Sequence, residues 1–102
     1  MTTAMDRGRL AHALREAVTR VDGVSRLVGD GPVEVAAQYP GGKVEGVSVS
    51  GDEPQVHIAV STLPVEPVAA RALSAARGVM TAAGDDRPVQ IVVADIDVER
   101  LE

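Results

Sequence analysis

Residues able to perform acid–base or nucleophilic chemistry are few, because the chain has two histidines and no cysteine. His57 lies between Val56 and Ile58, four residues before Ser61, and His12 lies in a separate segment. A serine–histidine–aspartate site would need a Gly-x-Ser-x-Gly elbow or an oxyanion loop, and the sequence has neither. A metal site would need several converging ligands, and neither histidine has a carboxylate at ligand spacing. We therefore expect surface histidines, no catalytic residue, no metal site and a protein that is not an enzyme.

Acidic and glycine-containing segments could bind a cation or a phosphate. Asp95, Asp97 and Glu99 would share one side of a strand, but they fall where the last predicted strand ends. A solvated strand end is the favoured interpretation. Residues 29–31 (Gly-Asp-Gly) begin like a dinucleotide loop, yet Glu34 stands where the third glycine would be. We expect no cofactor.

Composition narrows the classes of partner. The chain has 102 residues, 15 acidic against 10 basic, a formal net charge of −5 and one tyrosine as its only aromatic residue. That length predicts a single domain over residues 1–102. The acidic balance and the lack of stacking side chains argue against nucleic acid as a partner. Residues 1–20 contain scattered charges and no apolar segment, so we expect a cytoplasmic protein without direct membrane insertion.

The elements that must position these residues follow from hydrophobic periodicity. Leu10, Leu14 and Val18 recur at helical spacing, whereas Val56, Ile58 and Val60 alternate as in a strand. The predicted elements are a helix over residues 5–21, strands over 33–39, 43–50 and 55–62, a helix over 65–83, a strand over 88–96 and a tail over 97–102.

This order, α-β-β-β-α-β, predicts an α+β two-layer sandwich with both helices packed on one face of a mixed sheet. Residues 24–32 are interpreted as a connection, and the next three strands as an antiparallel meander with residues 33–39 at the edge. The last strand, almost continuously apolar, is expected at the centre of the sheet. Gly46 is the expected site of a bulge. Gly78, inside the second helix, suggests a close backbone contact.

Several stretches carry a family resemblance. They are Val56-His57-Ile58-Ala59-Val60, then Leu63-Pro64-Val65-Glu66-Pro67-Val68-Ala69, and after a helix Arg87-Pro88-Val89-Gln90-Ile91-Val92-Val93-Ala94-Asp95-Ile96. Upstream, Val21-Asp22-Gly23-Val24 follows the first helix, and Gly46-Val47-Ser48-Val49 precedes the hairpin. This pattern resembles the alkaline-shock-protein family of bacterial envelope stress response proteins. The resemblance implies a non-enzymatic cytoplasmic protein that self-associates beneath the membrane and reaches it through a separate anchor protein.

The sheet face that the helices do not cover is the predicted contact surface. Small and neutral side chains would point away from the helices there, without a charged residue in the middle of the face. They are Ser48, Ser50, His57, Ala59, Ser61, Gln90, Val92 and Ala94. We expect this face, or the edge at residues 33–39, to bind another copy or a partner. The alternative is a small enzyme or ligand-binding domain in which His57, Ser61 and Gln90 line a pocket.

Overall fold

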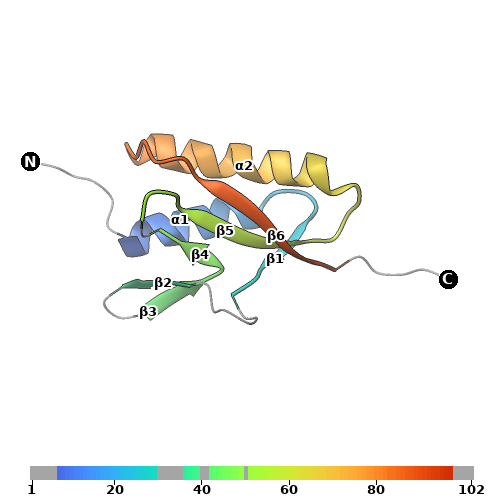
Figure 1. Cartoon of the computed structure of the whole chain (residues 1–102), viewed down its shortest axis with the longest axis horizontal. Helices are drawn as coiled ribbons and strands as arrows, with labels where there is room; N and C mark the ends of the chain where they lie inside the picture. The colour runs from blue at the N-terminus through green and yellow to red at the C-terminus, as the bar shows by residue number, and fades with distance from the viewer. Residues whose placement is uncertain (1–6, 30–35, 40–41, 50, 98–102) are drawn as a thin grey trace, which may run out of the picture.

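The computed structural model describes residues 7–29, 36–39, 42–49 and 51–97. Two helices cover one face of a mixed β-sheet, which confirms the predicted α+β two-layer fold (Figure 1). The helices are α1 (Arg7–Thr19) and α2 (Val65–Ala82), close to the predicted ranges. The strands are β1 (Val24–Leu27), β2 (Ala36–Tyr39), β3 (Gly42–Glu45), β4 (Val47–Ser48), β5 (Gln55–Val60) and β6 (Gln90–Ile96).

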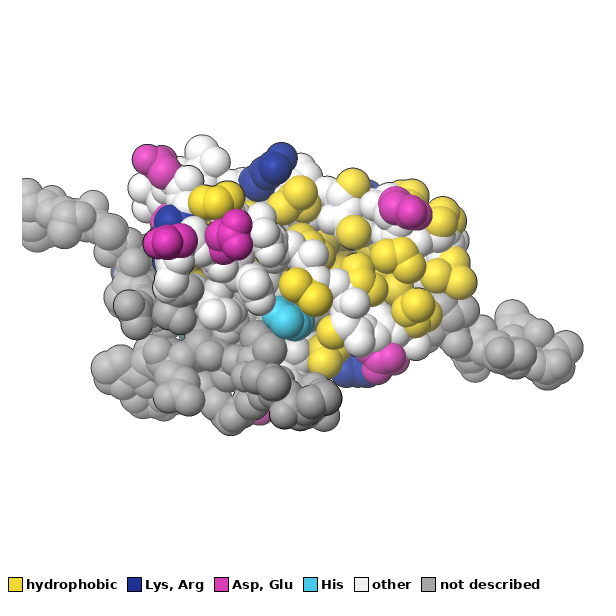
Figure 2. Space-filling model, viewed as in Figure 1, with side chains coloured by type: hydrophobic (Ala, Val, Ile, Leu, Met, Phe, Trp, Pro, Cys, Tyr) yellow, Lys and Arg dark blue, Asp and Glu magenta, His cyan; other side chains and the backbone are white. Residues whose placement is uncertain are grey.

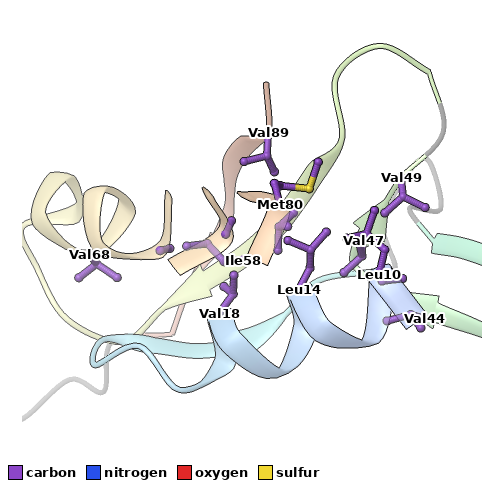
Figure 3. Close-up of a cluster of buried hydrophobic side chains, with 14 of the residues drawn as sticks. Leu10, Leu14, Val18, Val44, Val47, Val49, Ile58, Val68, Met80 and Val89 are labelled. Carbon is purple, nitrogen blue, oxygen red and sulfur yellow. The ribbon is translucent and has the colours of Figure 1, made fainter. Parts of the chain in front are cut away.

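The core is built from small aliphatic side chains between the helices and the sheet. Leu14 and Val18 of α1 and Met80 of α2 point toward Ile58 of β5 (Figure 3). Leu14, Val18 and Ile58 are fully buried, and Met80 is 3% exposed. The helical spacing of the α1 residues and the alternation along β5 therefore meet in one hydrophobic layer.

Strand β5 is the centre of the larger sheet. One of its edges pairs in parallel with β6, and the other edge is shared by two short antiparallel strands, β1 and β4. The partner of this edge changes from β4 to β1 at His57. The His57 N–H donates to the Gly46 carbonyl, and the His57 carbonyl accepts from the Val28 N–H, both at 2.8 Å. β1 and β4 therefore meet end to end along β5.

The strand β1 corrects the prediction of a connection over residues 24–32. It pairs Val24 with Val60 and Leu27 with Ile58, and a register shift lies between Val24 and Arg26. Because the extra residue, Ser25, separates the two inward side chains by three positions, the period of two that marks a strand is absent.

Gly46 breaks the predicted strand over residues 43–50 into β3 and β4. Its φ is +84°, and the flanking Val44 and Val47 are both buried although they are three positions apart. A regular strand would place these two valines on opposite faces. The slip predicted at Gly46 is present, but β2 and β3 form a separate two-stranded sheet instead of one continuous meander. Residues 33–35 of the predicted edge strand and Ser50 lie outside the described residues.

Two further expectations are wrong. β6 pairs with β5 alone among the described strands, so it is an edge strand and not a central one. Its apolar sequence is explained by α2, which packs beside it and leaves Ile91 and Val93 partly buried against the core. Gly78 has nothing within 4 Å of an added Cβ, so no close backbone contact requires glycine there.

Candidate interaction surface

The open face, defined as the sheet face opposite the helices, brings most of the predicted contact residues together in rows across the strands. Ser48 of β4 pairs with Gln55 of β5, which pairs with Gln90 of β6. In the next row His57 pairs with Val92. Side chains paired in this way project to the same side of a sheet. Ser48, His57, Gln90 and Val92 thus share one face, as the alternation in the sequence predicts, and Gln55 joins them without having been predicted.

A third row, at Ala59, differs from the expectation of a neutral face. Ala59 pairs with Arg26 on one side and with Asp95 on the other. The register shift between Ile58 and Ala59 leaves Ala94 without a pair in the ladder, so Asp95 takes the position predicted for Ala94. Charged side chains thus lie on a face whose middle was expected to have none.

Arg26 spans this row and joins the two outer strands of the sheet. Its Nε donates to Asp97 Oδ2 at 2.8 Å, and its Nη2 donates to Asp95 Oδ2 at 2.9 Å. The Ser25 hydroxyl also donates to Asp97 at 2.8 Å. These hydrogen bonds from Arg26 and then Ser25 lower the pKa of Asp97, and the same pairing raises the pKa of Arg26. We call this set of contacts the Arg26 bridge; it accounts for a β1–β6 link that the chain order alone does not indicate.

His57 is half-buried on the open face. Its Nε2 lies 3.0 Å from Gln55 Oε1, and burial lowers the pKa of the imidazole below 6.5. The neutral ring is therefore favoured near pH 7. In the part of the chain that the structure describes, no group of three histidine, aspartate or glutamate residues is placed to hold a metal ion.

The residues of the alternative, enzymatic prediction are spread over β5, the segment that follows it and β6. Ser61 lies four residues beyond His57, which in a strand corresponds to about 13 Å, too far for a direct hydrogen bond. The Ser61 hydroxyl instead donates to the Gly23 carbonyl at 3.3 Å. Gln90 lies opposite Gln55 and not opposite His57. The three side chains do not converge on one point.

Two shallow hollows lie beside α2, and neither is lined by His57 or Ser61. The first, which we call the α2–β6 groove, has a volume of about 340 Å³ and is lined by Ala69, Ala70, Leu73, Val89, Gln90 and Ile91. The second, about 400 Å³, adjoins the end of α2 and includes Arg77, Thr81 and Val89. Arg87 on its wall is already paired with Asp85, whose pKa is lowered by that contact.

Exposed apolar side chains gather along α2 and β6 on the face shown in Figure 2. Leu63, just before α2, is 56% exposed, and Ile96, at the end of β6, is 51% exposed. The sequence prediction missed this surface because it placed β6 inside the sheet. An edge strand flanked by an exposed apolar strip is a common feature of protein-binding surfaces.

Comparison of the chain with protein-family models, with curated proteins and with solved structures found no match. Among the described residues, no helix is long and apolar enough to cross a membrane.

Proposed function

We propose that this chain is an envelope stress response protein that acts by assembly: it associates with itself and with a membrane-anchored partner, and it catalyses no reaction. The stress role and the anchored partner rest on the sequence resemblance described above. The assembly role has separate support from the surface that follows.

The observation that carries the proposal is the apolar strip along α2 and β6. Leu63 and Ile96 are more than half exposed, and the α2–β6 groove lies beside a strand edge that pairs with no other described strand. Unpaired edges with apolar side chains are normally covered, charged or used for binding. From Gln90 to Ala94 this edge carries no charged residue, so binding is the use that fits it best.

The open face, which the sequence predicts as the contact surface, is not the primary contact surface in this proposal. Of its predicted contact residues, Ala59 is fully buried and cannot contact a partner, and the Arg26 bridge holds three charged groups across one end of the face. Charged groups that are already paired lose hydration when a partner covers them, which opposes tight docking there. We therefore assign primary contact to the α2–β6 side.

Two experiments test this function: one measures recovery of cells from alkaline shock, and the other measures binding of the purified chain to membranes. Cells that lack the chain should recover more slowly from alkaline shock than cells in which it is restored, and equal recovery would overturn the stress role. The purified chain should bind cell membranes but not protein-free lipid vesicles, and protease treatment of the membranes should remove the binding. Binding to bare vesicles would contradict a partner-mediated attachment.

A further inference from the structure

One stripe of α2, in which Glu66, Ala70 and Arg77 are exposed and Leu73 is partly buried against the core, has a self-complementary order of side chains. Glu66, Ala70, Leu73 and Arg77 follow one another at intervals of four, three and four residues. Eleven residues make about three helical turns, so Glu66 and Arg77 lie on nearly the same side of α2, about 16 Å apart. When two such stripes run antiparallel, the acid of each lies opposite the base of the other, and the small residue of each lies opposite the apolar one. The stripe is therefore complementary to a second copy of itself.

This stripe faces the free edge of the sheet. Ala70 and Leu73 line the α2–β6 groove together with Ile91, and Arg77 lines the neighbouring hollow with Val89. The stripe and the edge of β6 therefore form one continuous surface, with a charge of opposite sign at each end of its helical part.

The two charged ends are available for an external partner. Among the described residues, neither Glu66 nor Arg77 forms an ion pair or a side-chain hydrogen bond. Arg71, next to Ala70 in the sequence but outside the stripe, instead donates to the Asp22 carbonyl at 3.0 Å. The fold thus uses the arginine beside the stripe internally and leaves both charges of the stripe exposed.

The backbone of β6 offers hydrogen bonds at the same place. The Gln90 N–H donates to the Pro54 carbonyl, toward β5, at 2.8 Å. Because consecutive residues of a strand direct their backbone groups to opposite sides, the N–H and C=O of Ile91 point away from β5. Ile91 thus presents one donor and one acceptor beside the groove.

We propose that a second copy of this chain binds here, with β6 antiparallel to β6 and α2 antiparallel to α2 about one two-fold axis. The axis passes at Ile91 and between Ala70 and Leu73, so that Ile91 exchanges two hydrogen bonds with its own equivalent. Glu66 of each copy then faces Arg77 of the other, and each Ala70 faces a Leu73. Such an isologous contact gives hydrogen-bond partners to the outward backbone groups of Ile91 and ion-pair partners to Glu66 and Arg77 at once. The inference rests on the proposed function, because it names the self-association surface.

Charge reversal with mixing tests this arrangement. Glu66→Arg alone and Arg77→Glu alone each place like charges together twice, and each should weaken self-association at least about tenfold in sedimentation velocity. An equimolar mixture of the two variants should recover it as a mixed dimer, because both cross-pairs become attractive. The matched controls are Glu53→Arg and Arg15→Glu, which reverse exposed charges off the stripe and should leave association unchanged.

The outcomes separate the two proposals. A wild-type chain that stays monomeric at every concentration overturns both self-association and this surface. A wild-type chain that associates, with single variants that associate equally well or a mixture that recovers nothing, overturns the surface and leaves the proposed function standing. As an independent measurement, exchange of the Ile91 amide hydrogen should slow with rising protein concentration, and a rate that does not depend on concentration would contradict the pairing at β6.

Discussion

Replacement of Gly46 by alanine tests the meeting of β1 and β4 along β5. An added Cβ at Gly46 would lie 2.7 Å from the Leu27 Cβ and 3.1 Å from the Val28 nitrogen. Gly51 is the matched control, because its φ of +80° is close to the +84° of Gly46 but nothing lies within 4 Å of its added Cβ. The two substitutions therefore differ mainly in the clash with β1.

The expected magnitude follows from two contributions. A positive φ costs a non-glycine residue about 1–2 kcal/mol, and the smaller entropy of the unfolded chain returns about 0.4–1 kcal/mol, at either position. Overpacking against Leu27 adds about 1–3 kcal/mol at Gly46 alone. We expect Gly46→Ala to lower the free energy of unfolding by about 1–3 kcal/mol more than Gly51→Ala does.

Urea unfolding measures this difference. The chain has no tryptophan, so far-ultraviolet circular dichroism is the appropriate probe, at one protein concentration for all variants. Equal losses of stability for the two substitutions would refute the contact between Gly46 and β1, and with it the shared edge of β5.

Three other substitutions or titrations have defined outcomes. Gly78→Ala should raise the free energy of unfolding by about 0.5–1 kcal/mol, because the helix gains a better former and the added Cβ meets nothing within 4 Å; a loss in the same urea assay would contradict the exposed position. Arg26→Gln should raise the pKa of Asp97 toward 3.8, as followed by carboxyl NMR. The pKa of Asp97 in the folded chain lies below that in the unfolded chain, so stabilisation by the Arg26 bridge is present at neutral pH. It is lost as the pH falls below 3.8 through the folded pKa. An unchanged titration of Asp97 in the variant would exclude the bridge. His57 should titrate below 6.5 in imidazole NMR, because burial disfavours the charged ring; stability then rises with pH up to about 6.5, and a pKa above that value would contradict the half-buried position.

The parts of the fold with regular periodicity were predictable from the sequence. The inward residues of α1 and β5, such as Leu14 and Ile58, follow the periods of a helix and a strand without interruption. Irregular strands were predicted only in part: the sequence indicated the slip at Gly46 but not the strand β1. Ser25 breaks the alternation of β1, and the positive φ at Gly46 turns two valines to the same side.

The open face was predictable only where the register is regular. His57 and Val92 are paired as alternation requires, but the shift after Ile58 replaces Ala94 by Asp95. The role of Arg26 was not predicted because β1, the strand that contains it, was not predicted. A bulge that contains no glycine, like the irregularities at Ser25 and after Ile58, moves side chains by one position without leaving a clear mark in the sequence.

The surface along α2 and β6 could not be predicted from the sequence for a different reason. The spacing from Glu66 to Arg77 can be read directly in the sequence, but its meaning depends on the neighbour of α2. An apolar strand such as β6 is expected inside a sheet unless a helix supplies the missing burial. Here α2 supplies it, which leaves the outer edge of β6 free among the described strands.

Sedimentation equilibrium of the wild-type chain beside Arg77→Glu tests the central claim of assembly through α2 and β6 most directly. With rising concentration, the wild-type mass should increase from 10.6 kDa toward twice that value, while the variant stays at the mass of one chain over the same range. A wild-type mass of 10.6 kDa at every concentration, or equal association of the variant, would contradict the claim.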